Sequence, residues 1–298
     1  MNYQNKCSTK KPEMSITRET FQKIFLNLHL KLIIESNQNR KTMIEKRPLI
    51  LITNDDSIAA PGLLRLVDCM PADADIVVVA PAEPHSGQAS AITINSPLRV
   101  ASRPDYNGAR MFTVNGTPVD CVKLAAAAVL PRRPDFVFAG INHGSNSGCN
   151  VIYSGTMGAV MEGCALGASS CGFSLLHHSL QADFSMCMDH VRRIISELME
   201  NPLPSGICLN VNIPARVTPL GVKACRAARG HWTDEYRRYT DPTGNPFYML
   251  AGRFNNDEPD ATDTDEYWLS RNYISLVPVC TDLSAGTYIE TAAGIYNK

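Results

Sequence analysis

Residues 48–53 read PLILIT and are followed at once by the polar stretch Asn54-Asp55-Asp56. A short, continuous apolar run is typical of a strand buried on both faces of a parallel sheet. Pro61 then opens a helical pattern of apolar residues, and residues 75–80 (DIVVVA) repeat the pattern of a buried strand. This order of strand, helix and strand predicts an α/β protein built on a parallel sheet.

The same alternation continues along the chain. We expect further strands at 91–94, 110–114, 135–139, 207–213 and 272–279, and helices at 118–130, 156–166 and 184–199. Residues 140–155 are mostly Gly, Asn and Ser and predict a loop, while 283–296 predict a tail or a helix. The expected fold is a doubly wound, Rossmann-like three-layer sandwich with a mainly parallel sheet, forming one domain over residues 48–298.

Two segments differ from this pattern. Residues 1–47 carry ten basic and four acidic residues, whereas the rest of the chain carries 18 basic and 25 acidic ones. We predict that 1–47 is an extension outside the fold: a loosely attached amphipathic helix, a disordered segment, or a stretch upstream of a natural start at Met43. Residues 219–272 are polar and rich in Arg and Tyr, and predict a protruding β-hairpin arm.

The composition excludes several classes of protein. The net charge of −1 shows no basic excess for binding a nucleic-acid duplex. No apolar stretch approaches the ~18 residues of a membrane helix, and no secretory signal pattern is present. The ten cysteines lack the spacing of zinc sites and are expected to be reduced, buried thiols. These features predict a soluble, cytoplasmic protein that binds no membrane.

Polar residues follow two of the predicted strands. Adjacent carboxylates at Asp55 and Asp56 repel each other, and a hard cation that bridges them relieves the repulsion. The alternative is a plain turn in which Asp56 caps the next helix. Ser86, in the loop after residues 75–80, could offer its hydroxyl to a cation or a phosphate, or it could belong to a turn.

A glycine-rich stretch predicts an anion site. Residues 140–148 (GINHGSNSG) follow a predicted strand, and Ser154-Gly155-Thr156 precede a predicted helix. Backbone N–H groups in such loops and at helix N-termini bind phosphate. Neither the nucleoside-triphosphatase nor the dinucleotide motif matches, because the glycine spacing differs and no Lys follows. His143 could transfer protons or simply pack, and Thr117 is expected to cap the helix that starts at Pro118.

Several ordered motifs together resemble the survival protein E (SurE) family of metal-dependent nucleotide phosphatases: ILITNDD (50–56), APxxxxSG (80–87), VNGTPVDCV (114–122), AGINHGSNSG (139–148), YSGTMGAVMEG (153–163), LNVNIP (209–214) and YISLVPVCTDLS (273–284). The resemblance implies hydrolysis of nucleoside 5′-monophosphates, with 3′-monophosphates and short polyphosphate as further candidate substrates. It also implies a homodimer or homotetramer that uses the arm for subunit contacts.

The resemblance also implies the site residues. The metal ligands would be Asp55, Asp56, Ser86 and Asn142, and catalysis would depend on Asp55, Asp56 and Asn142. Substrate or phosphate contacts are expected at Asn54, Gly87, Gly144, Ser154, Gly155 and Thr156. Because all the ligands are oxygens, we expect one Mg²⁺ or Mn²⁺ per subunit rather than zinc.

Two departures from the family pattern are visible. Ser57 stands where the family usually has Gly, and the second loop reads AEPHSG (82–87) without its common Asp and Arg residues.

Two other classes of protein are alternatives to the phosphatase. One is a phosphate-receiver module, which needs a further strand-end Asp and a later Lys that are not evident here. The other is a non-catalytic nucleotide-binding protein, which release of phosphate in the presence of a divalent metal would exclude.

Overall fold

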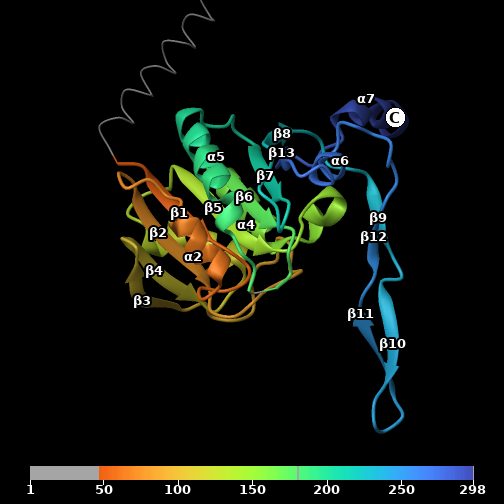
Figure 1. The fold of residues 1–298 in the computed structure, drawn as a ribbon, viewed down its shortest axis with the longest axis horizontal. Coiled ribbons are helices and arrows are strands. Elements are labelled where there is room, and N and C mark those ends of the chain that lie inside the picture. Colours follow the sequence, from red (N-terminus) through yellow and green to blue (C-terminus); the bar gives the residue numbers. More distant parts are fainter. Residues whose placement is uncertain (1–46, 180, 298) are drawn as a thin grey trace, which may run out of the picture. The chain divides into compact units, whose positions relative to one another are not determined.

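The computed structural model describes residues 47–179 and 181–297, so the predicted extension lies outside the described residues apart from Arg47. A nine-stranded sheet forms the centre of the fold, in the order β3-β4-β2-β1-β5-β6-β7-β13-β8 (Figure 1). Its strands are β1 (Leu49–Thr53), β2 (Asp75–Pro81), β3 (Val100–Tyr106), β4 (Ala109–Val114), β5 (Phe136–His143), β6 (Ser169–Leu175), β7 (Ile207–Ile213), β8 (Val222–Ala224) and β13 (Ile274–Cys280). Most neighbours pair in parallel; β3 with β4 and β13 with β7 are antiparallel. The predicted mainly parallel sheet is confirmed.

Helices cover both faces of this sheet. One face packs against α2 (Pro61–Val67) and α5 (Met188–Glu200), the latter preceded by the 3₁₀ turn η3 (Ser185–Cys187). The other face packs against α3 (Pro118–Leu124), its π-helical continuation η1 (Ala125–Val129), and α4 (Gly155–Ala165). The three-layer, doubly wound arrangement is therefore the predicted one.

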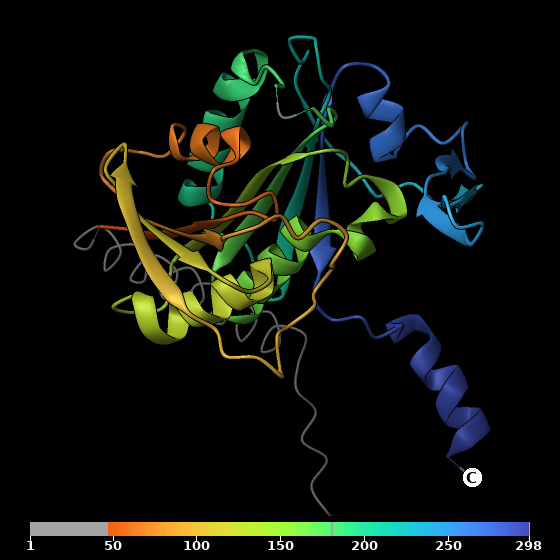
Figure 2. The same cartoon turned by 90° about the horizontal axis from the view of Figure 1, so that it is seen from below.

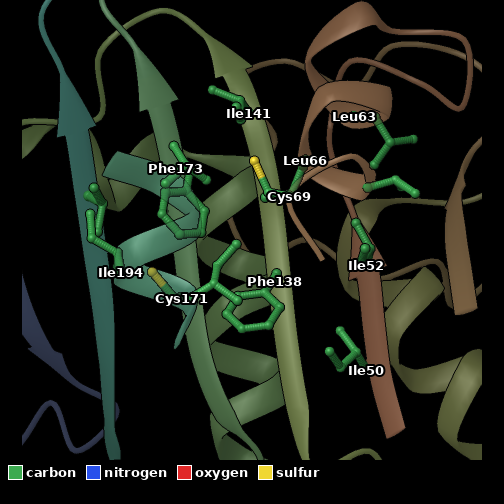
Figure 3. Packing of buried hydrophobic residues seen from close by; sticks show 14 of the residues in the cluster. Ile50, Ile52, Leu63, Leu66, Cys69, Phe138, Ile141, Cys171, Phe173 and Ile194 are labelled. Carbon is green, nitrogen blue, oxygen red and sulfur yellow. The ribbon is translucent and has the colours of Figure 1, made fainter. Parts of the chain in front are cut away.

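The alternation of side chains along β1 explains the two buried layers. Ile50 and Ile52 point into one core, while Leu49 and Leu51 point into the other. Figure 3 shows Ile50 and Ile52 in the first core, together with Leu66 of α2. Because both faces of the strand are covered, every residue of LILIT is buried, which is why the run reads as continuously apolar.

Local signals fix the helix starts. At α3, the Thr117 hydroxyl accepts a hydrogen bond from the Asp120 N–H at 3.1 Å, and the Asp120 carboxylate accepts one from the Thr117 N–H at 2.9 Å. This reciprocal capping box, followed by Pro118 in the first turn, confirms the predicted cap.

Some predicted elements were wrong. Residues 91–94 form no strand but an irregular, solvent-exposed segment, since their apolar residues face no covering layer. The predicted loop 140–155 is shorter, because β5 continues to His143 and residues 148–153 form the 3₁₀ helix η2 (Gly148–Tyr153). Strands β3 and β6 were not predicted. Strand β6 is fully buried, but its sequence SSCGFSL contains small polar residues and therefore lacks the apolar run that is typical of a buried strand.

The C-terminal part of the chain includes one long antiparallel arm built from two short two-stranded ladders (Figure 1). Strands β9 (Gly230–Thr233) and β12 (Arg253–Asn256) pair near the body, and β10 (Tyr236–Thr240) pairs with β11 (Pro246–Leu250) further out (Figure 1). Within the predicted arm, β8 pairs with β13, and the short helix α6 (Asp265–Leu269) buries Asp265 and Leu269, so the projecting part is narrower than 219–272.

The last helix, α7 (Gly286–Tyr296), buries none of its residues and stands clear of the sheet (Figure 2). Across the described residues, no helix is both long and apolar enough to span a bilayer. All cysteines among the described residues, from Cys69 to Cys280, are free thiols. Most of them are buried, as the sequence predicts.

Candidate active site

The site lies where the strand order reverses. From β1 the chain moves outward to β2, whereas β5 pairs with the opposite side of β1, with Thr53 opposite Ala139. In open α/β sheets, ligands bind at the carboxyl ends of strands next to such a reversal. Asp55 and Asp56 follow β1 there, and Asn142 and His143 end β5 beside them.

Asp55 is buried against the start of α4. Its Oδ1 accepts a hydrogen bond from the Thr156 hydroxyl at 2.5 Å. A Cβ built on Gly155 would lie 3.0 Å from Asp55 Cβ, a tight contact, so glycine eases this close approach. Burial raises the pKa of the Asp55 carboxyl to about 6, opposed by the bond from Thr156, while the charge of Asp56 raises it further. An ionised Asp55 is therefore costly unless a positive charge lies nearby.

Asp56 is held from β5. Its Oδ2 lies 2.9 Å from His143 Nδ1 and also accepts a hydrogen bond from the His143 N–H at 3.2 Å. No hydrogen bond from the described residues engages Asp56 Oδ1. Each carboxylate of the pair is thus anchored by a different element, Asp55 by α4 and Asp56 by β5.

Asn142 sits at an irregularity in β5. The register between β5 and β6 shifts between Ala139 and Asn142, and such bulges re-aim side chains at the ends of strands. The Asn142 amide nitrogen donates to the Gly144 carbonyl at 3.0 Å. Because its nitrogen is engaged, the amide oxygen is the atom left to bind a ligand.

Ser86 and Gly87 lie in an exposed loop that is tied to the same strand end. The His85 N–H donates to the Asp55 carbonyl at 2.8 Å, and Ser86 follows directly. The Ala89 N–H donates to the Tyr153 carbonyl at 3.2 Å, which joins this loop to η2. The structure therefore brings the second loop to the site.

Asn54 shapes the turn that presents the two carboxylates. Its amide nitrogen donates to the Ser57 carbonyl at 2.8 Å, while its buried Oδ1 has no partner among the described residues. Ser57 adopts φ 97°, a left-handed conformation that glycine takes most easily. This conformation explains why the resembled family usually has Gly at this position.

The remaining predicted phosphate contacts divide into two groups. The Gly144 N–H donates to the Leu175 carbonyl at 2.9 Å, and the Ser154 hydroxyl caps α4 by accepting from the Met157 N–H at 3.0 Å. Both groups thus already serve the fold. Gly155 and Thr156 form the first turn of α4, where the helix dipole favours an anion, although the hydroxyl and the backbone N–H of Thr156 already bond to Asp55.

A buried polar network behind the site was not predicted. The backbone N–H of Asn146 donates to Asn212 Oδ1 at 2.7 Å. The side-chain nitrogen of Asn146 donates to the Ser174 hydroxyl at 2.7 Å. Asn210 donates to the Asn146 carbonyl at 2.8 Å and accepts from Asn212 at 3.1 Å. The signal was present in the sequence, because Asn210 and Asn212 alternate on one face of an otherwise apolar strand.

Asp265 joins the same loop to the arm. This fully buried carboxylate accepts hydrogen bonds from the backbone N–H groups of Gly148 and Ala228, each at 2.8 Å, and of Glu266 at 2.9 Å. Next to it, the Ser147 hydroxyl donates to Glu266 at 2.5 Å. Sequence reasoning named neither acidic residue, since nothing in their local context distinguishes them from surface residues.

The side chains at the site fit a hard divalent cation. In the described part of the chain, no three His, Cys, Asp or Glu residues gather closely enough to hold a metal. A cation here would therefore depend on two carboxylates together with the neutral oxygens of Ser86 and Asn142. The costly burial of Asp55 beside Asp56 is what such a cation would relieve, and oxygen donors suit Mg²⁺ or Mn²⁺.

Comparison with known proteins assigns the family. The family model described as survival protein SurE matches residues 50–234. The chain belongs to the SurE family. It is 44% identical to a 5′-nucleotidase SurE of Phocaeicola vulgatus over 82% of this chain and 95% of the relative, and 45% identical to a 5′-nucleotidase SurE of Christiangramia forsetii over 83% and 96%.

The fold agrees with a solved SurE structure. The SurE protein of Aquifex aeolicus is 30% identical and matches with a TM-score of 0.71, over 83% of this chain and 99% of that one. Membership of the SurE family, which the motifs indicated, is therefore confirmed. The phosphate-receiver alternative was wrong.

Proposed function

We propose that this SurE-family chain is a 5′-nucleotidase, a phosphoric monoester hydrolase that depends on a divalent cation. The observation that carries the proposal is the meeting of two carboxylates at the end of β1 with the first turn of α4, through the bond between Thr156 and Asp55. This contact would bring the proposed cation site beside the proposed phosphate site. The relatives named 5′-nucleotidase SurE support the same activity.

Asp55, Asp56, Ser86 and Asn142 would hold one Mg²⁺ or Mn²⁺ per subunit. When bound, the cation supplies Lewis-acid polarisation of the phosphoryl group and activation of water. Asp55 and Asp56 provide the negative charge that retains it. Asn142 contributes its amide oxygen, because its nitrogen is engaged by Gly144.

The start of α4 would orient the substrate. The first turn of α4, at Gly155 and Thr156, would face the non-bridging phosphate oxygens, with the helix dipole adding partial positive charge. The Thr156 hydroxyl donates to Asp55 and would so hold the proposed phosphate site close to the proposed cation site. We propose that Asn54 and Gly87 lie beside the bound phosphate, and that 3′-monophosphates and short polyphosphate are further substrates.

The arm would assemble the enzyme into a homodimer or homotetramer. All residues of β10 and β11 are exposed, among them Tyr236 at 67% and Leu250 at 73%. Among residues 47–179 and 181–297, nothing covers the exposed aromatic and apolar side chains of this hairpin. Exposed apolar patches of this kind mark interaction surfaces.

The test is phosphate release from a panel of nucleoside 5′- and 3′-monophosphates and short polyphosphate, after chelation and titration with Mg²⁺ or Mn²⁺. We expect turnover that is lost on chelation and restored by either metal. Turnover that survives chelation would contradict the metal site. Absence of turnover with every substrate and metal would favour the non-catalytic nucleotide-binding protein.

A further inference from the structure

We infer that His143 is a positioning residue that fixes the orientation of Asp56, so that Asp56 Oδ1 is presented to the cation. This inference rests on the proposed function, because it assigns a role toward the metal of the same site. His143 is not among the proposed metal ligands. It acts through Asp56.

Two donors of His143 converge on one oxygen of Asp56. The distance from His143 Nδ1 to Asp56 Oδ2 is 2.9 Å, and the backbone N–H of the same residue reaches this oxygen at 3.2 Å. A carboxylate on a turn would otherwise sample several rotamers, and ordering it on cation binding would weaken the affinity. With Oδ2 fixed at both donors, Oδ1 is held in one direction.

The imidazole itself has little freedom. Its side chain is 3% exposed, and its ring packs edge-on against buried Phe184 with the centroids 5.5 Å apart. The ring therefore holds the Asp56 carboxylate at a fixed position relative to β5. An outer contact of this kind orients a metal ligand and typically affects metal affinity ~10–100-fold.

The other ring nitrogen indicates that packing does not explain this histidine. Because Asp56 accepts the bond, the Nδ1 atom carries a proton. Nε2 is buried and has no hydrogen-bond partner among the described residues. A polar atom buried without a partner destabilises a fold, and an apolar side chain would avoid that penalty. The bond from Nδ1 to Asp56 supplies the reason for an imidazole here.

The experiment measures binding of Mn²⁺ to the full chain by equilibrium dialysis, without substrate, in the wild type and in His143→Leu, His143→Asn and Phe184→Leu. We expect His143→Leu to weaken Mn²⁺ binding ~10–100-fold, since it removes the Nδ1 donor. His143→Asn should restore affinity to within about threefold of the wild type, because its amide nitrogen occupies the position of Nδ1. Melting temperatures of all four proteins accompany the titration.

Phe184→Leu is the matched control, because it loosens the packing of the ring without removing the donor. It should bind Mn²⁺ within about threefold of the wild type. Equal losses in Phe184→Leu and His143→Leu would make the effect one of packing and overturn the inference. If His143→Leu does not fold, His143→Gln replaces it, since its amide nitrogen reaches the place of Nε2 and should weaken binding similarly.

The remaining outcomes separate this inference from the proposed function. Wild-type affinity in His143→Leu would overturn the positioning role even if turnover falls, and would point to proton transfer instead. A wild-type protein that binds no Mn²⁺ would overturn both the inference and the metal site. Weakened binding in His143→Leu together with rescue by His143→Asn supports the inference.

Discussion

The site at the carboxyl ends of β1 and β5 differs from the projecting arm in what holds it in place. At the site, Asp55 and Asn146 are buried and each is bonded to an element distant in sequence. On β10 and β11 every residue is exposed, and the contact between Tyr239 and Phe247 stays within the hairpin, with ring centroids 5.5 Å apart. The site is thus determined by the subunit's own core, whereas β10 and β11 bury none of their residues, which is why we propose that this hairpin packs against a partner.

The largest expected effect is a loss of phosphatase activity without a loss of stability. Asp55→Asn removes a charge that would retain the cation, so we predict at least a ~100-fold loss of metal-dependent phosphatase activity. The melting temperature should stay the same or rise, because burial raises the pKa of Asp55 to about 6 and makes its ionised form costly at neutral pH. Metal-titrated turnover and a melting curve measure the two effects.

Ser86→Ala should cost less activity than Asp55→Asn, since water can replace a neutral oxygen ligand. Near-wild-type turnover of Asp55→Asn at ordinary metal concentrations would favour the plain turn over the metal site. In that case Asn would serve the turn as well as Asp does.

The second prediction addresses the junction of the two regions. Asp265→Ala leaves three backbone N–H groups without their acceptor and should lower the free energy of unfolding by about 2–4 kcal/mol. Chemical denaturation measures the change. The matched control is Asp263→Ala, which removes an exposed ion pair with Arg226 and should cost less than about 1 kcal/mol. Equal effects of the two variants would show that burial of Asp265 is unimportant.

The third prediction tests whether the hairpin needs a partner. Replacing residues 235–251 by a short Gly-Ser turn should raise the dissociation constant of the assembly at least tenfold, about 1.4 kcal/mol, while the subunit keeps its fold. Light scattering over a range of protein concentrations measures the assembly, and circular dichroism checks the fold. A full-length protein that is monomeric at micromolar concentration would contradict the predicted homodimer or homotetramer.

The smallest expected effect concerns the backbone at the site. Ser57→Gly relieves the left-handed conformation at φ 97° and should stabilise the protein by about 1 kcal/mol, or raise its melting temperature by roughly 2–4 °C. Turnover should not change. Ser57→Ala keeps the unfavourable conformation and is expected to give no gain. A stabilisation by Ser57→Ala equal to that by Ser57→Gly would show that the backbone angle is not responsible.

Truncation should leave both regions intact. We predict that a protein beginning at Met43 folds and keeps its activity, since residues 1–42 lie outside the matched family region. A large loss of melting temperature or turnover after truncation would show that the extension supports the fold.

Much of the fold could be predicted because its signals are local. The buried strands β1, β2 and β7 read as apolar runs, and Thr117 with Pro118 signals a helix start within four residues. Strand β6 could not be recognised, since its sequence SSCGFSL is buried by neighbours rather than by its own hydrophobicity. The strand predicted at 91–94 was wrong for the opposite reason. An apolar segment forms a strand only where a neighbouring strand pairs with it, and none pairs with these residues.

The amino-acid sequence determined the residue types of the site and the family, because carboxylates at strand ends and glycines at a helix start are local patterns. Tertiary structure decided how they are held. Thr156 lies 101 residues from Asp55, and His143 lies 87 residues from Asp56, yet each pair meets in a hydrogen bond. Such contacts depend on the pairing of β1 with β5 and on the packing of α4, which no short stretch of sequence specifies.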